Sequence, residues 1–151
     1  METAIHRRVQ RLRAAGDPGL IARLSSGWAV LGEQQFLRGY ALLLPDPVVD
    51  TFNDLAPVLR AQVMQDAAAL GDALLAVTGA LRINYAIFGN LEPALHVHVV
   101  PRFAGESDAL RTAHPWAYDW NAAPRLDAAR DGELIAQLRA ALQGFQQIRQ
   151  V

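Results

Sequence analysis

The chain has 151 residues, and its 14 basic side chains nearly balance 15 acidic ones, leaving a formal net charge of −1. This length suits a single domain, residues 1–151, with a core of its own. The near-neutral charge removes the basic surface expected of proteins that bind extended nucleic acids. The sequence contains no cysteine and no lysine. These absences exclude disulfides, thiolate nucleophiles, cysteine-ligated metals, a Walker lysine and a Schiff base.

Residues 3–24 are predicted to form two short helices. Apolar side chains recur at helical spacing in the first of them, at Ile5, Val9 and Leu12. Asp17 and Pro18 then offer a cap and a first-turn residue for the second. The first helix also carries arginines, expected to form a solvated face, at positions 7, 8, 11 and 13. Because no signal-like or bilayer-spanning apolar run is present, a cytoplasmic protein without a membrane partner is expected.

Two strands and a long helix are predicted next. Residues 28–31 and 40–44 have strand character, and a hairpin is the economical way to pair them. The helix covers 57–78 and carries one apolar stripe at intervals of four and three, formed by Leu59, Val63, Ala67, Leu70, Leu74 and Val77. Gly79 ends this helix, and Gly71 in its interior costs it roughly 1 kcal/mol relative to alanine.

A second pair of strands is predicted at 81–88 and 95–100. An irregular segment with Trp116 and Trp120 follows, and the last helix is predicted over 131–149. Its apolar residues are Leu134, Leu138, Leu142, Phe145 and Ile148. Because the strands come in pairs and do not alternate strictly with helices, the sequence predicts an α+β fold. Its antiparallel sheet of about four to six strands is covered by the long helix and the C-terminal helix.

The motif His96-Val97-His98 carries the most distinctive chemistry of the chain. Side chains alternate across a strand, so both imidazoles project from one face and Val97 from the other. Two functions fit such a pair. Histidines at i and i+2 can bind one metal ion, with further ligands sought among His6, His114, Glu92 and Glu106. Alternatively, one imidazole acts as a nucleophile and the other donates to the reacting group.

The residues around this pair resemble the histidine triad (HIT) family. Residues 94–102 read ALHVHVVPR, similar to the family signature in which histidines alternate with apolar residues and Pro-Arg often follows. Upstream, RGYALLLP at 38–45 is similar to the family's Pro-Gly-His strand ending in proline. The segments INY at 83–85 and GNLEP at 89–93 resemble the approach to the triad. The resemblance covers the order of elements over 27–103.

This resemblance implies a function. Members of the family are nucleotide hydrolases and nucleotidyl transferases, usually homodimers, that act at the α-phosphate of substrates such as dinucleoside polyphosphates and nucleoside phosphoramidates. The family's nucleophile corresponds to His96, and its donor near the leaving group corresponds to His98. The expected partners are therefore a small nucleotide and a second copy of the chain. The chemistry requires no metal or other cofactor.

Two positions depart from the family pattern. Ala94 stands at the first triad position, and Tyr40 replaces the histidine of the Pro-Gly-His segment. Because alanine keeps its backbone carbonyl, the resemblance still implies that a carbonyl near Ala94 orients the nucleophile. Tyr40 is expected to remove an imidazole from the pocket wall.

Four further residues are candidates for substrate binding. Asn90 corresponds either to the family's polar Asn or to its phosphate-contacting Gln. Asn84 bridges strands or faces the phosphate, and Arg102 forms a structural pair or contacts an anion. Glu33 is offset by one position from the family's ribose-binding acid and is otherwise a solvated carboxylate. Trp116 and Trp120 cover the base, join the dimer surface or simply pack.

The hypothesis from the sequence is therefore a HIT-like hydrolase that acts through a nucleotidyl-histidine intermediate on His96. Two other classes remain open. The departures at Ala94 and Tyr40 also fit a protein that binds nucleotides without turnover. The His96 and His98 pair taken alone also fits a metal-binding protein.

Overall fold

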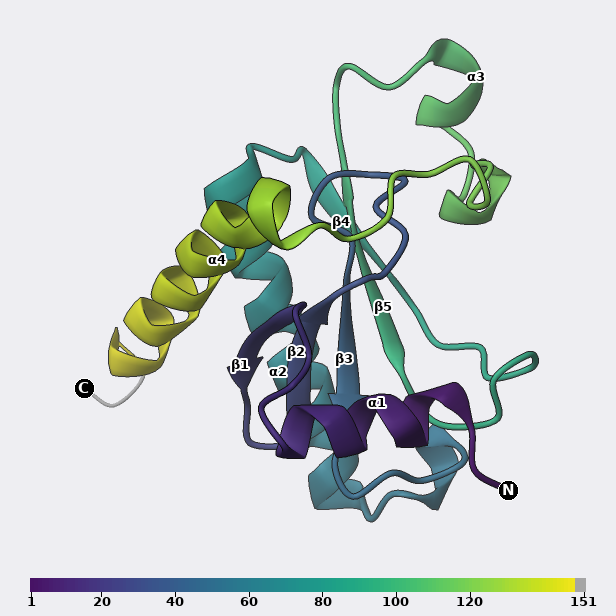
Figure 1. Ribbon diagram of the computed structural model, residues 1–151, viewed down its shortest axis with the longest axis vertical. Helices are drawn as coiled ribbons and strands as arrows, with labels where there is room; N and C mark the ends of the chain where they lie inside the picture. Colours follow the sequence, from purple (N-terminus) through teal and green to yellow (C-terminus); the bar gives the residue numbers. More distant parts are fainter. Residues whose placement is uncertain (149–151) are drawn as a thin grey trace.

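A computed structural model describes residues 1–148, with side chains up to residue 145. The elements follow in the order α1 (Ala4–Arg13), β1 (Leu20–Arg23), β2 (Gly27–Leu31), β3 (Ala41–Pro45), η1 (Phe52–Asp54), α2 (Pro57–Thr78), β4 (Arg82–Ala86), β5 (Val97–Arg102), α3 (Asp108–Arg111), η2 (Pro115–Ala117) and α4 (Ala128–Ile148). The strands form one five-stranded antiparallel sheet in the order β1-β2-β3-β5-β4. The predicted α+β class is confirmed (Figure 1).

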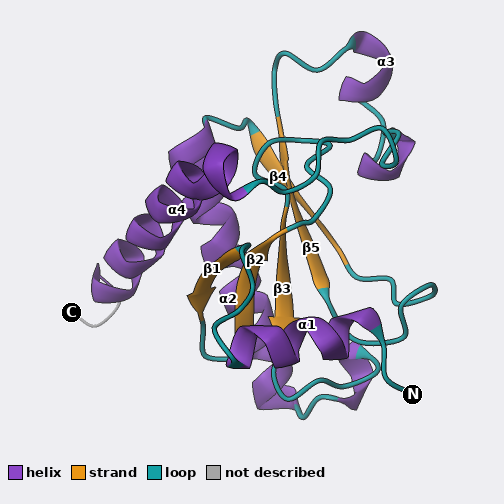
Figure 2. Ribbon diagram, viewed as in Figure 1, coloured by secondary structure: helices purple, strands orange, loops and turns teal. Residues whose placement is uncertain are grey.

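The sheet separates two apolar layers. On one face, α2 and α4 pack on the sheet through residues that include Leu70 and Leu138. On the other face, α1 packs across the lower part of the strands (Figure 2), and its Val9 and Leu12 join a second cluster. In the part of the chain that the structure describes, no helix is long and apolar enough to cross a membrane.

Both predicted pairs of strands are present, with shifted ends. Strands β2 and β3 pair antiparallel, as do β4 and β5. The strand predicted at 95–100 runs instead from Val97 to Arg102, because the Leu95 N–H donates to the Val49 carbonyl at 2.7 Å and so lies outside the sheet ladder. Strand β5 lies between β3 and β4, which places the histidine motif at an interior strand of the sheet.

The second N-terminal helix, predicted to begin at Asp17, is wrong. The Asp17 carboxylate accepts a hydrogen bond from the Gly19 N–H at 2.9 Å, which closes a turn. The chain then forms β1 and pairs with β2. Asp17 also binds the buried guanidinium of Arg8 over 2.9 and 3.2 Å. The arginines of α1 are therefore not all solvated, because Arg8 anchors the helix to this turn.

Helix α2 confirms the predicted bounds and most of the predicted stripe. Gly79 ends it in the left-handed conformation with φ 73°, which glycine adopts without steric cost. Leu59, predicted to be in the stripe, lies in the first turn of the helix and is 47% exposed. A Cβ on Gly71 would lie 2.0 Å from the Tyr85 hydroxyl. The glycine that weakens the helix locally thus gives β4 room to pack.

Helix α4 begins at Ala128, three residues before the predicted start. The reason is a cap, since the Asp127 carboxylate accepts the Arg130 N–H at 2.8 Å and satisfies a free donor of the first turn. Leu134, Leu138 and Leu142 are buried as predicted. The predicted end at residue 149 and the side chain of Ile148 lie outside the described residues.

Candidate functional site

The two histidines of the motif lie side by side on one face of the sheet. His96 directly precedes β5 and His98 is its second residue, and their ring centroids are 4.7 Å apart at 72°. Val97 and Val99 project to the other face and join the core beneath α2. Each histidine is 9% exposed. The predicted common face is confirmed, and the pair is nearly withdrawn from solvent.

A backbone carbonyl orients His96. Its Nδ1 lies 2.7 Å from the carbonyl oxygen of Ala94. A carbonyl oxygen only accepts hydrogen bonds, so Nδ1 carries the proton and Nε2 keeps its lone pair. The expectation that the Ala94 carbonyl orients this imidazole is confirmed. The loss of a histidine side chain at Ala94 therefore leaves the orientation of His96 intact.

A tyrosine hydroxyl contacts Nδ1 of His98, the atom that in His96 contacts the Ala94 carbonyl. The Tyr40 hydroxyl lies 2.7 Å from Nδ1 of His98. Burial, and after it the neighbouring His96, lower the pKa of His98 to about 3. Burial also raises the pKa of Tyr40, against a lowering effect of the Arg8 charge. The sequence indicates only that Tyr40 removes an imidazole, whereas the structure places its hydroxyl against His98. The hydroxyl of the tyrosine was the signal for this contact.

Aromatic rings surround His98. The Trp116 ring lies 4.8 Å away at 88°, while Phe88 and Trp120 lie 6.2 and 6.4 Å away. Trp120 also contacts Tyr40 at 5.1 Å. Trp116 is 37% and Phe88 57% exposed. The tryptophan segment therefore packs directly on His98, and the rings of Trp116 and Phe88 beside it are partly exposed.

Arg102 and Asn84 contact each other. The Arg102 guanidinium donates to the Asn84 side-chain oxygen at 2.8 Å, to the Ala113 carbonyl at 2.8 Å and to the Leu110 carbonyl at 2.7 Å. It also donates to the Glu106 carboxylate over 2.8 to 3.2 Å. These bonds use all five guanidinium N–H groups. Arg102 thus ties the segment after β5 to the sheet.

Glu106, at the centre of this network, stays ionised. Burial raises its pKa, but hydrogen bonds from Arg102, Tyr118 and the Phe103 N–H outweigh burial and hold the pKa below its ordinary value. Burial and the neighbouring Glu106 carboxylate raise the pKa of the Tyr118 hydroxyl to about 12. The network therefore holds a buried ion pair between Arg102 and Glu106. This is the structural pair that the sequence offered as one alternative for Arg102, although the sequence did not name Glu106 as its partner.

Glu33 and Asn90 lie apart from this network. Glu33 is half exposed, 3.5 Å from both Arg11 and Arg125, and lines a charged cavity with Arg8 and Asp17. Asn90 is exposed in the loop that joins β4 to β5. The structure does not bring either residue into contact with the histidines among the residues it describes, so their binding roles stay predictions.

The metal-ligand candidates do not assemble. Within residues 1–148, no three His, Cys, Asp or Glu side chains converge on a possible metal position. His6 contacts Thr3 at the start of α1, and Glu92 accepts the Ala4 N–H at 3.1 Å. Glu106 is bound to Arg102. The pair at His96 and His98 therefore has no third ligand in the described part of the chain.

Known structures share this fold. A histidine triad protein from Bradyrhizobium japonicum is 27% identical, with 82% of this chain and 89% of that chain covered and a TM-score of 0.69. A histidine triad protein from Marinobacter aquaeolei VT8 is 17% identical, with 95% and 98% covered and a TM-score of 0.74. A hypothetical histidine triad nucleotide-binding protein from Sulfolobus tokodaii strain7 is 12% identical, with 91% and 92% covered and a TM-score of 0.72.

The comparison with curated proteins found no significant match. The model of the HIT domain, however, matches residues 24–105, which is more than half of the chain and includes the four strands β2 to β5 with the histidine pair. Family model, fold and motif thus agree, and the chain belongs to the HIT domain family.

Proposed function

We propose that this protein hydrolyses a nucleotide phosphoanhydride or phosphoramidate bond through a covalent nucleotidyl intermediate on His96. One observation carries the proposal: the Nδ1 of His96 is engaged by the Ala94 carbonyl at 2.7 Å, so its Nε2 lone pair is free for attack. An imidazole held in this tautomer is a neutral nucleophile, and covalent catalysis divides one difficult displacement into two easier ones.

The reaction balances in two steps. First, Nε2 of His96 attacks the α-phosphorus, a P–N bond forms, and the bond to the leaving oxygen or nitrogen breaks with its electron pair going to the leaving group. Second, water attacks the same phosphorus, the P–N bond breaks, and its electrons return to Nε2. A nucleoside monophosphate leaves, and the protons of water are shared between it and the first leaving group.

Negative charge on the phosphoryl oxygens needs aimed donors in both steps. His98 lies beside His96 and is the first of these donors. Asn90 and main-chain N–H groups are the others. Removing one such donor typically costs roughly 3–4 kcal/mol of transition-state stabilisation. No step requires a metal or another cofactor.

The remaining candidate binding residues differ in the hydrogen-bonding groups that are available for a substrate. Asn84 uses its side-chain oxygen on Arg102, and its amide nitrogen has no partner among the described residues, so it can donate to a substrate. Arg102 would contact an anion only by exchanging one of its existing bonds. Glu33 is proposed to accept ribose hydroxyls. The Sulfolobus protein is named as a hypothetical histidine triad nucleotide-binding protein, and this name supports a nucleotide as the ligand class.

A second copy of the chain is the proposed protein partner. Strand β4 is an edge of the sheet, and an unpaired edge is a template for another chain. Beside it, α2 and the β4 region expose large apolar side chains, with exposed fractions of 36% to 44%, at Met64, Leu75, Tyr85 and Ile87. Pairing two such faces would bury them. The cytoplasmic location expected from the sequence remains part of this proposal.

The test measures turnover of diadenosine polyphosphates and of an adenosine phosphoramidate in the presence of a chelator. Wild type should release a nucleoside monophosphate, and protein quenched in alkali, in which a P–N bond is stable, should carry the mass of one nucleotidyl group. His96→Ala should lose both signals. His114→Ala is the matched control, because His114 is exposed in the segment after β5, and it should keep both. Turnover that persists in His96→Ala would disprove the nucleophile.

Two outcomes would replace this proposal. Nucleotide binding measured by calorimetry without any turnover would identify a binding protein, the alternative that the alanine at position 94 keeps open. Activity that appears only when a divalent metal is added would identify a metal-dependent protein. The geometry favours neither, because the Ala94 carbonyl prepares His96 for attack and no third metal ligand is found in residues 1–148.

A further inference from the structure

The contact between Tyr40 and His98 links two distant parts of the chain. The hydroxyl and Nδ1 are 2.7 Å apart, and their residues are separated by 58 positions. Tyr40 is 3% exposed and His98 9% exposed. Sheet register explains why they meet, because Leu42 of β3 pairs with His98 of β5 and Tyr40 lies two residues before Leu42. The hydroxyl therefore approaches the imidazole from within the apolar layer.

The direction of this hydrogen bond follows from what each group can do. If Nδ1 of His98 donated, the tyrosine proton would need another acceptor, and the hydroxyl has no second partner among the residues that the structure describes. An unpaired buried donor is costly. If the hydroxyl donates, every proton is used, because Nδ1 accepts and the ring proton lies on Nε2. The second arrangement is the one that satisfies both groups.

The loop before β3 holds Tyr40 firmly. The Gln35 amide donates to the carbonyls of Gly32 and Tyr40 at 2.8 and 2.9 Å, and its oxygen accepts the Gly39 N–H at 2.9 Å. A Cβ on Gly32 would lie 2.2 Å from the Tyr40 ring, so glycine at this position makes space for the phenol. The Phe36 ring packs on Tyr40 at 4.9 Å.

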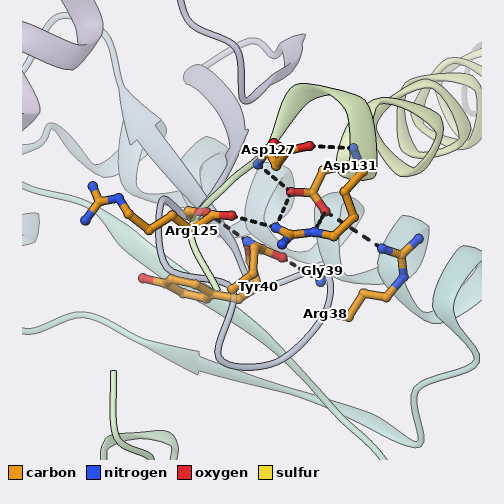
Figure 3. A network of polar contacts seen from close by, with 9 residues as sticks. Arg38, Gly39, Tyr40, Arg125, Asp127 and Asp131 are labelled. Atoms are coloured by element: carbon orange, nitrogen blue, oxygen red, sulfur yellow. Dashed lines mark hydrogen bonds and ion pairs between the residues drawn. The ribbon is translucent and has the colours of Figure 1, made fainter. Parts of the chain in front are cut away.

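A second network braces the same loop from outside. The Asp131 carboxylate accepts from the Asp127 N–H at 2.9 Å and from Arg130 at 2.7 Å, and lies 3.9 Å from Arg38. Figure 3 shows these groups clustered at one end of the loop, with the ring of Tyr40 pointing away from Asp131. The loop is thus tied to the start of α4 while its phenol is directed to the other side.

We propose that Tyr40 is a positioning residue that holds His98 in the Nε2–H tautomer, with this N–H directed as a donor to the phosphate. This inference rests on the proposed function, in which His98 stabilises charge on the phosphoryl group. His96 and His98 then carry opposite tautomers. His96 presents a lone pair to phosphorus, and His98 presents a proton to oxygen, so nucleophile and donor differ only in the group that meets Nδ1.

Few charges act on this contact. Within the described residues, His96 faces the His98 ring at 4.7 Å, and the Arg8 charge acts on Tyr40. The other rings against His98 are Phe88, Trp116 and Trp120, which do not titrate. Burial, and after it the neighbouring His96, lower the pKa of His98 to about 3, so the imidazole is neutral near pH 7. A neutral imidazole carries one N–H proton, and it can donate to the phosphate only if that proton lies on Nε2.

Nuclear magnetic resonance of the imidazole nitrogens tests the tautomers without any substrate. In wild type, proton–nitrogen correlations should show the proton of His96 on Nδ1 and that of His98 on Nε2. In Tyr40→Phe, which keeps the ring and loses the hydroxyl, His98 should become a mixture while His96 is unchanged. A His98 proton on Nδ1 in wild type, or an unchanged His98 in Tyr40→Phe, would overturn the inference.

Kinetics tests the consequence on whichever nucleotide wild type turns over. Tyr40→Phe should lower kcat about tenfold or more with KM nearly unchanged, as for a donor that acts in the transition state. Tyr40→His should recover part of the loss, because an imidazole N–H can also donate. Gly32→Ala should lower kcat by displacing the ring while leaving the hydroxyl present.

An equal kcat in wild type and Tyr40→Phe would contradict the positioning role. The two proposals fail separately in this design. If wild type turns over none of the nucleotides, the proposed function fails, while the nitrogen spectra still decide whether Tyr40 sets the tautomer of His98.

Discussion

His96 and His98 have the same side chain, lie on the same face of the sheet and are equally exposed. What differs is the partner of Nδ1: a carbonyl oxygen for His96 and a phenol hydroxyl for His98. Because a carbonyl only accepts and a hydroxyl can donate, the two rings take different tautomers. In the proposed function, these neighbouring groups give two identical residues different roles. One of the groups is a backbone carbonyl, which is present whatever side chain stands at position 94.

The buried His98 also predicts how stability changes with pH. Its folded pKa, about 3, lies below the ordinary value of 6.5. Between these values the unfolded chain binds a proton that the folded chain does not, so stability falls as pH falls from 6.5 towards 3. The slope from this one group approaches 1.4 kcal/mol per pH unit, about the value of one pKa unit.

Urea denaturation at several pH values checks this expectation. His98→Asn should show a shallower loss of stability over the interval from 6.5 to 3 than wild type. His114→Asn is the control, since His114 is exposed, and it should follow wild type. A His98→Asn profile parallel to that of wild type would contradict the assigned burial effect.

At the scale of elements, Arg102 decides where the segment after β5 lies. Its side chain and that of Glu106 are 8% and 4% exposed and form an ion pair at 2.8 Å. The Arg102 guanidinium also binds the carbonyls of Leu110 and Ala113, and the Tyr118 hydroxyl donates to Glu106 at 2.6 Å. This network therefore places the irregular segment that carries Trp116 against His98.

Arg102→Met should destabilise the fold by about 3–5 kcal/mol, because it leaves the Glu106 carboxylate buried without its cation. Urea denaturation at neutral pH measures the loss. Adding Glu106→Gln to Arg102→Met should cost less than the sum of the two single changes, since the uncompensated charge is removed.

Arg111→Met is the matched control for the Arg102 experiment. Arg111 is half exposed and its partner Asp108 is almost fully exposed, at 3.3 Å. Exposed ion pairs contribute about 0–1 kcal/mol, so this change should have a small effect. A similar loss for Arg102→Met and Arg111→Met would show that the buried network does not hold the segment.

At the scale of the whole molecule, the edge strand β4 and the neighbouring side of α2 are the surfaces proposed to bind a partner. Strand β1, the other edge, is covered in part by α4, whose Arg139 donates to the carbonyls of Leu20 and Ile21. Strand β4 has exposed apolar neighbours instead, among them Leu75 and Tyr85. This asymmetry between the edges favours β4 as the interface between two copies.

Leu75→Glu should therefore convert a dimer into a monomer, because it places a charge in the centre of the proposed interface. Light scattering after size exclusion measures the mass. Leu59→Glu is the control on the same helix, at 47% exposure but on the other side of the buried stripe, and it should remain a dimer. A monomeric wild type, or a dimeric Leu75→Glu, would exclude this interface.

The amino-acid sequence by itself determined the features that depend on neighbouring residues. The strands, the long helix and the common face of the two histidines follow from periodicities of two and about four residues, which act within one element. The α+β class follows from the order of these elements along the chain. The carbonyl of Ala94 is also local, two positions from His96. These parts could be predicted because their causes lie within a few residues of their effects.

Only the tertiary structure decided the contacts that join distant segments. The turn at Asp17, where a helix was predicted, depends on Arg8. The partner of Arg102 includes Asn84, 18 positions away, and the partner of His98 is Tyr40, 58 positions away. The type of a residue determines which hydrogen bonds and ion pairs it can form. Which of them form depends on the groups that the packed layers bring next to it. For this reason the sequence indicated His96 as the candidate nucleophile, through the resemblance to the HIT family, and the fold revealed the hydroxyl that contacts its neighbour His98.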